Sequence, residues 1–279
     1  MIEIGVYQKL KIYKRKSQGL YLLDEKDGDE VLLPNAECSD DLEIGDYIQV
    51  FVYLDSEERE IATLKKPIVT LNSFGSLTVK YNSSIGAFCD WGMPKDLLVP
   101  FHEQKEPMKE GQRYIVYMYL DEVSDRLVGT TKLRRYLNPF ADNSLKLGQE
   151  VEALIYQETN IGYKAVINQS FTGLIYKSEL NGVNITIGDT LKAYVKPIRD
   201  DKKIDLSLNP LGFKNVETNV DLILNALDAS GGYLPFNDKS SPEAIRETFG
   251  ISKKVFKKII GVLYKQKQIV IESKGIKKV

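Results

Sequence analysis

Residues 148–208 decide the fold, and they read GQEVEALIYQETNIGYKAVINQSFTGLIYKSELNGVNITIGDTLKAYVKPIRDDKKIDLSL. Short apolar or alternating runs recur in this stretch at 153–156, 173–176, 191–195 and 204–208, and glycines or charged turns separate them. Short strands at nearly even spacing, joined by such turns, are typical of a small closed β-barrel. The stretch therefore predicts a five-stranded barrel.

The sequence before residue 148 holds two weaker copies of this pattern. A turn glycine lies in the second half of each of the three units, at Gly45, Gly111 and Gly188. Sixteen residues after each glycine comes an apolar residue of the expected closing strand, Ile61, Leu127 or Ile204. A repeat of roughly 70 residues indicates tandem copies of one structural unit. We therefore expect three tandem five-stranded barrels, over residues 1–64, 67–133 and 145–210.

Glycine-centred motifs recur within these units. The second contains Gly86-Ala87-Phe88-Cys89-Asp90-Trp91-Gly92, and the third contains Gly173-Leu174-Ile175-Tyr176 and ends in Leu206-Ser207-Leu208. This order resembles the S1 RNA-binding domain, whose pattern has a Gly-Ala-Phe-Val strand, a Gly-Leu-Val-His turn and a final Leu-Ser-Leu. The resemblance implies OB-fold barrels, which bind single strands by stacking bases on exposed aromatic rings while cations follow the phosphates.

After Pro210 the apolar period changes from two to 3.6, which indicates helices. The expected caps are Ser240 or Ser241 for the second helix and Ser252 for the third. With a short strand pair after residue 268, three helices predict an α+β winged-helix domain over residues 216–279. On the third helix the apolar residues share one side, and the other side carries Gly261, Tyr264 and the lysines Lys253, Lys254, Lys257, Lys258 and Lys265.

Charge is unevenly distributed along the 279 residues, although the net charge is only −1. Acidic residues outnumber basic ones in residues 1–64, whereas residues 251–279 contain nine lysines and one acid. We expect a polyanion to be held mainly at the C-terminal end, the alternative being a solvated lysine face. The sequence has only two cysteines and no signal-peptide pattern at its N-terminus, which favours a cytoplasmic protein. It contains no long apolar run, so we expect no membrane segment.

The S1 resemblance selects the aromatic candidates. The stacking Phe of the pattern corresponds to Tyr21, Phe88 and Lys164, and its His corresponds to Pro34, Pro100 and Tyr176. No unit keeps both rings, and each ring has an alternative place in a barrel core. Because acidic clusters surround Tyr21 in the sequence, we expect the third unit to bind best and the first least. Tyr163 is expected to point away from the mapped face.

These observations give one set of RNA-binding candidates. The rings stack bases, and the lysines of the third barrel and of the third C-terminal helix hold phosphates. Lysines lack the planar fork that reads base edges, so sequence-specific recognition by the helix is not expected. The predicted residues are Phe88, Lys164, Tyr176, Lys177, Lys253, Lys254, Lys257, Lys258 and Lys265.

Catalysis has little support in the sequence. His102 is the single histidine, and Cys89 lies on an expected strand, so a buried structural thiol and a surface histidine are favoured over a nucleophile pair. The Cys and His residues are too few for zinc, and no glycine-rich phosphate loop occurs. We expect no enzyme activity, no cofactor and no metal.

The whole chain resembles the conserved virulence factor B family of Gram-positive bacteria, most closely at residues 86–100 and 249–265. The resemblance implies a cytoplasmic RNA-binding protein in post-transcriptional regulation, including that of virulence factors. Two alternatives stay open: a duplex-DNA regulator acting through the winged helix, and a scaffold whose acidic first unit contacts other proteins. Residues 134–140 are either a linker or a basic-aromatic strap over a barrel.

Overall fold

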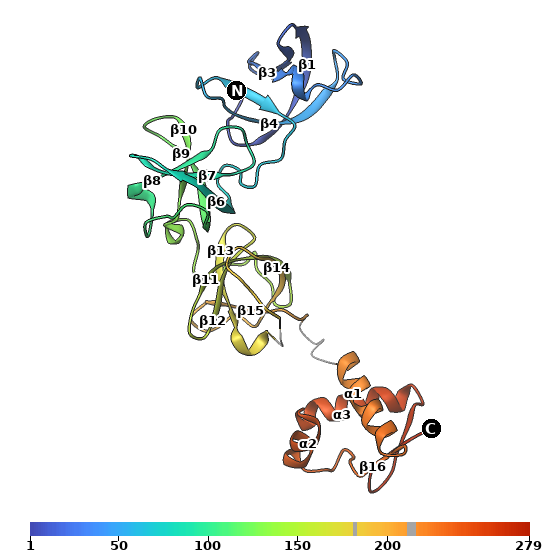
Figure 1. Ribbon diagram of the computed structural model, residues 1–279. Coiled ribbons are helices and arrows are strands. Elements are labelled where there is room, and N and C mark those ends of the chain that lie inside the picture. The colour runs from blue at the N-terminus through green and yellow to red at the C-terminus, as the bar shows by residue number, and fades with distance from the viewer. Residues whose placement is uncertain (181–182, 211–215) are drawn as a thin grey trace. The chain divides into compact units, whose positions relative to one another are not determined.

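The computed structural model describes residues 1–180, 183–210 and 216–279, and the chain forms two compact units (Figure 1). Met1–Leu208 is the first unit and contains three β-modules, and Asn209–Val279 is the second. In the described part of the chain, no helix has the length and apolar character needed to span a bilayer.

The first module is a closed barrel with the strand order β1-β2-β3-β5-β4. Its strands are β1 (Tyr7–Lys16), β2 (Gly19–Leu23), β3 (Glu30–Pro34), β4 (Tyr47–Leu54) and β5 (Glu60–Thr63). Alternate residues such as Leu10, Ile12 and Leu22 fill the interior, as the period of two requires. A bulge between Ile12 and Lys14 bends the long first strand around the barrel.

The middle module differs from the expectation of a third closed barrel. Its strands are β6 (Phe74–Asn82), β7 (Gly86–Asp90), β8 (Leu97–Pro100), β9 (Arg113–Asp121) and β10 (Arg126–Thr130), in the order β10-β9-β6-β7-β8. The two outer strands lie side by side without a hydrogen-bonded ladder. A Cβ added at Gly129 of β10 would lie within 3.2 Å of the side chains of Val99 and Leu97, so β10 packs closely against β8. The structure therefore shows closed barrels for the first and third modules and a five-stranded sheet for the middle one.

The third module, which contains the stretch quoted first, is a closed barrel as predicted. Its strands are β11 (Glu150–Glu158), β12 (Gly162–Ile167), β13 (Phe171–Tyr176), β14 (Thr190–Val195) and β15 (Ile204–Ser207), in the order β11-β12-β13-β15-β14. Parallel pairing of β13 with β15 closes it, for example between Ile175 and Leu206. Residues 181–182, within the range expected for this barrel, lie outside the described residues.

Aromatic residues join the three modules. Phe51 and Tyr53 of the first barrel pack edge-on against Trp91 of the middle module, with ring centroids 5.9 and 6.3 Å apart. Between the middle and third modules, Tyr136 stacks on Tyr117 at a centroid distance of 3.9 Å. The side chain of Gln169 also accepts a 2.6 Å hydrogen bond from the backbone N–H of Phe74. These contacts make one packed body of the three modules.

The second unit has the three helices and the small sheet of a winged helix. The helices are α1 (Val216–Ala229), α2 (Pro242–Phe249) and α3 (Lys253–Lys265), and the sheet has the order β16-β18-β17, with β16 (Tyr233–Leu234), β17 (Ile269–Ile271) and β18 (Ile276–Lys278). Ser241 and Ser252 cap α2 and α3 by accepting backbone hydrogen bonds. Gly250 ends α2 with a φ of +68°, a conformation that glycine adopts without strain.

Candidate nucleic-acid interface

The outer face of the third barrel presents a tyrosine and a lysine side by side. Along β13, Gly173 and Ile175 are buried while Leu174 and Tyr176 are partly exposed, because successive residues point to opposite faces. Lys164 on β12 lies opposite Leu174, which is two residues before Tyr176 on β13. Lys196 places its ammonium 5.8 Å from the centre of the Tyr176 ring. Tyr176 is therefore a half-exposed ring beside cations.

The two predicted lysines of this barrel differ in their partners. Lys177, in the short 3₁₀ turn η4 (Lys177–Glu179), forms a 2.9 Å ion pair with Glu158, which raises the pKa of the lysine. Lys164 makes no ion pair within the described residues, and partial burial together with nearby Arg134 and Lys105 lowers its pKa. A phosphate would thus meet a free cation at Lys164 and a shared one at Lys177.

Tyr163 lies on the opposite side of the β12–β13 strand pair from Lys164 and Tyr176. It lies next to Lys164 on β12 and packs against the interior cluster of the barrel. The expectation that Tyr163 points away from the mapped face is confirmed, so Tyr176 is the ring available on the outer face of this strand pair.

In the middle module, Phe88 already has an aromatic partner. Its ring stacks on Tyr81 with centroids 4.8 Å apart and 13° between the planes. Tyr81 is 45% exposed and Phe101, which begins the turn η2 (Phe101–Glu103), is 54% exposed. The module therefore offers an apolar, aromatic surface, in which one face of Phe88 is occupied by Tyr81.

The surroundings of Tyr21 in the first barrel differ from the expectation. Lys16 and Lys14 place their ammonium groups 4.6 and 5.3 Å from the centre of its ring. Acidic residues are the neighbours of Tyr21 along the sequence, whereas the pairing of β1 with β2 sets Lys14 directly opposite Tyr21. Lys14 also pairs with Glu30 at 2.6 Å, so its charge is partly neutralised.

The lysines of α3 lie on the side of the helix that faces away from its core. Phe256, Ile259, Ile260 and Leu263 are buried, and Lys254, Lys257, Lys258 and Lys265 are exposed, while Lys253 is half-buried. Gly261 lies within this lysine face, and a Cβ added there would meet no atom within 4 Å. Tyr264, 56% exposed, is the aromatic member of the face. The face is a cationic strip suited to phosphates.

The groups considered for catalysis lie apart from these surfaces. Cys89 is fully buried, and this burial raises the pKa of its thiol to about 12. The side chain of His102 is 78% exposed and lies 3.9 Å from the carboxylate of Glu103. Among the described residues, no group of three or more His, Cys, Asp or Glu side chains is arranged to hold a metal.

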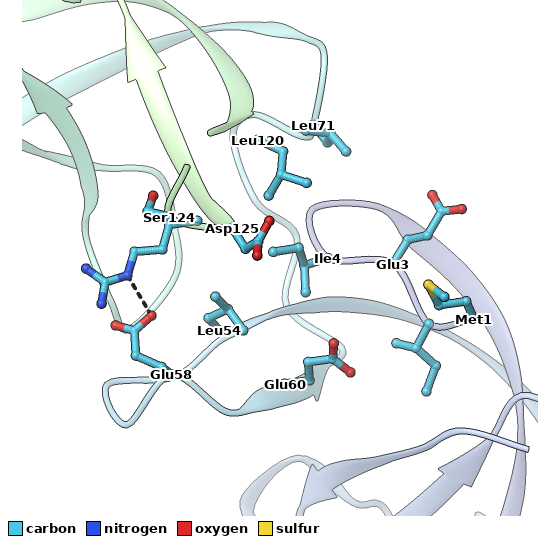
Figure 2. A pocket seen from close by; sticks show the side chains of 12 residues that line it. Met1, Glu3, Ile4, Leu54, Glu58, Glu60, Leu71, Leu120, Ser124 and Asp125 are labelled. Atoms are coloured by element: carbon cyan, nitrogen blue, oxygen red, sulfur yellow. Dashed lines mark ion pairs between the residues drawn. The ribbon is translucent and has the colours of Figure 1, made fainter. Parts of the chain in front are cut away.

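A pocket of about 650 Å³ lies between the N-terminal segment and the β9–β10 turn (Figure 2). Its polar lining is mostly acidic, and Arg126 is paired with Glu58 at 3.0 Å. Carboxylates repel phosphate, so this pocket does not suit a nucleic acid. The acidic residues that line it are Glu3, Glu58, Glu60 and Asp125.

Comparison with known proteins identifies two kinds of domain. Residues 4–65 match the S1 domain model, and residues 221–277 match the model of the CvfB-like winged helix domain. The chain is 30% identical over 262 residues to "Conserved virulence factor B" of Staphylococcus aureus strains N315 and USA300, covering 91% of this chain and 87% of the relative. A crystal structure described as a multidomain protein with nucleic acid binding domains from Streptococcus pneumoniae is 27% identical, with 99% and 98% coverage and a TM-score of 0.42.

Proposed function

Because this chain belongs to the conserved virulence factor B family, we propose that it is a non-enzymatic RNA-binding protein of the cytoplasm that acts in post-transcriptional regulation, including that of virulence factors. The S1 and winged-helix domains indicate nucleic-acid binding. The observation that carries the choice of single-stranded RNA is the outer face of the third barrel, where the half-exposed Tyr176 lies beside Lys164 and Lys196.

The chemistry of this face suits an unpaired strand. A base stacks on an aromatic ring only when its own face is uncovered, which is the case in single strands and not inside a duplex. Tyr176 supplies the ring, Lys164 and Lys177 supply cations, and Phe88 adds a second ring in the middle module. Stacking is tolerant of sequence, so we expect weak base preference.

The lysine face of α3 adds affinity without selecting a sequence. Each phosphate that a lysine neutralises releases condensed counterions, which makes binding fall with rising salt. Lys253, Lys254, Lys257, Lys258 and Lys265 carry this contribution in our proposal. They present point charges and not the bidentate fork with which Arg reads guanine, so we expect them to contact the phosphate backbone of the nucleic acid and not its bases.

A titration of the full chain with three ligands of equal length tests the proposal. Single-stranded RNA, duplex RNA and duplex DNA are compared at one salt concentration. We expect the single strand to bind most tightly. Tightest binding to duplex DNA would instead favour a regulator that acts through the winged helix.

The acidic pocket favours a second role as a protein-binding surface. Its carboxylates and the apolar side chains of Ile4, Leu54 and Leu120 suit a basic segment of another protein. Cross-linking in cells followed by nuclease treatment distinguishes the two roles, because contacts held by RNA disappear on digestion. Protein cross-links that survive digestion and are lost in a Glu60→Lys variant would support the protein-binding role.

A further inference from the structure

Residues 132–138 form a strap that is fixed between the middle and third modules. The strap contains the 3₁₀ turn η3 (Leu133–Arg135). Leu133 and Leu137 are buried together with Phe74 of β6 and Val166 of β12. Tyr136 stacks on Tyr117, and Asn138 forms a β-bridge to Phe171. The backbone around Arg134 is therefore anchored on both sides, while its side chain stays exposed.

Arg134 lies close to the outer face of the third barrel described above. Leu133, the neighbour of Arg134, is buried in one cluster with Val166, which lies two residues from Lys164 on the same face of β12. The backbone N–H of Lys105 donates a 2.7 Å hydrogen bond to Thr131, just before the strap, so the three cations lie in one region of the molecule. Tyr156 packs against the same buried cluster as Leu133, and its hydroxyl is hydrogen-bonded to Thr172 on this face. Thr172, Leu174 and Tyr176 follow one another on that side of β13, so the cations continue the surface that carries Tyr176.

The carboxylates of this region are engaged with other cations. Glu103 binds Arg135 at 3.1 Å and Glu158 binds Lys177 at 2.9 Å. Glu106 lies 3.9 Å from Lys105, with both side chains well exposed. Within the part of the chain that the structure describes, neither Arg134 nor Lys164 makes an ion pair or a side-chain hydrogen bond. Like charges that gather without a counterion repel one another, and a bound anion removes that repulsion.

Resting on the proposed RNA binding, we propose that Arg134 and Lys164, with Lys105 beside them, form a phosphate-binding site at the joint between the middle and third modules. The guanidinium of Arg134 can donate two parallel hydrogen bonds to one phosphate, and Lys164 neutralises it from the barrel wall. Lys164 pairs with Leu174, which lies two residues before Tyr176 on the same face of β13, a distance of roughly 7 Å along the strand. The site thus holds the backbone next to a base stacked on Tyr176.

The test uses the full chain and a salt titration of single-stranded RNA binding. Arg134→Ala and Lys164→Ala are compared with Lys26→Ala, which removes an exposed lysine from the first barrel. Each of the first two variants is expected to lose about 3- to 10-fold in affinity at 0.15 M salt, and to lower the slope of log K against log salt by about 0.7. Lys26→Ala is expected to change neither value.

Two further variants separate this site from a general charge effect. Arg134→Lys keeps the charge but not the fork, so it is expected to restore the salt slope and only part of the affinity. The double variant Arg134→Ala/Lys164→Ala is expected to lose less than the sum of the single losses, because both residues hold one phosphate. Thermal unfolding of Arg134→Ala should occur no lower than that of the unaltered chain, since the side chain makes no contact that the fold needs.

The outcomes distinguish this inference from the proposed function. If the unaltered chain binds no single-stranded RNA, RNA binding and the phosphate site are both rejected. If it binds, but Arg134→Ala matches Lys26→Ala in affinity and slope, the phosphate site alone is rejected.

Discussion

The outer face of the third barrel and the lysine face of α3 expose different chemical groups. The barrel face has the partly exposed Tyr176 ring with Lys164 and Lys196 beside it. The α3 face has four exposed lysines and one exposed ring, Tyr264. A ring distinguishes unpaired from paired bases, whereas lysines bind the phosphate backbone of any nucleic acid. In our proposal, selectivity for single strands therefore comes from the barrel, and most of the salt-dependent affinity comes from the winged helix.

Removing the lysines of α3 is expected to have the largest effect. Changing Lys253, Lys254, Lys257 and Lys258 to Ala should weaken single-stranded RNA binding about 100-fold at 0.15 M salt and lower the salt slope by about 3. Duplex RNA should lose a similar factor, because the lysines contact only backbone. Filter binding at several salt concentrations measures both quantities.

A charge-matched control accompanies that variant. Lys26, Lys65, Lys66 and Lys109 are exposed and lie outside the proposed surfaces, so changing these four to Ala alters the net charge equally. We expect this control to keep most of the affinity. Equal losses in the two quadruple variants would mean that net charge and not the α3 face drives binding.

Removing the Tyr176 ring is expected to have the second-largest effect. Tyr176→Ala should cost about 1–3 kcal/mol of single-strand binding free energy, the contribution of one stacked base. Duplex affinity and the salt slope should stay nearly unchanged, and Tyr176→Phe should restore binding. A matching loss on duplex RNA would show that the ring does not stack bases.

Gly261→Ala is expected to have the smallest effect, and it acts on stability. The added methyl group has open space, and alanine is favoured over glycine inside a helix by about 0.5–1 kcal/mol. Chemical denaturation monitored by helix content should therefore show a stabilised α3, with the salt slope of binding unchanged. A lower stability would indicate that this part of the lysine face packs against another surface.

The periodic parts of the fold could be predicted from the sequence. Alternation with glycine turns predicted the closed barrel in residues 148–208, and the change of period after Pro210 predicted the winged helix. The open edge between β8 and β10 could not be predicted. Whether these two strands, far apart in the sequence, pair through their backbones is a tertiary property that leaves no periodic signal.

The candidate site was predictable in its residue types and less so in its ionic partners. The two residues that the S1 pattern selected in the third barrel, Tyr176 and Lys164, are partly exposed, and their part in RNA binding stays a prediction. The ion pair of Lys177 with Glu158 and the lysines around Tyr21 depend on strand register. Strand register cannot be inferred from the net charge of a sequence segment. Arg134 was visible in the sequence only as part of a basic-aromatic segment, and its place beside Lys164 follows from the packing of the strap.

The most direct test of the central claim is ultraviolet cross-linking of the full chain to a uridine-containing single strand, followed by mass spectrometry of the cross-linked peptides. The account predicts cross-links in the peptide of β13 that contains Tyr176 and in α3, with the β13 cross-link absent from duplex RNA. Cross-links confined to the first barrel, or a β13 cross-link of equal yield on duplex RNA, would contradict it.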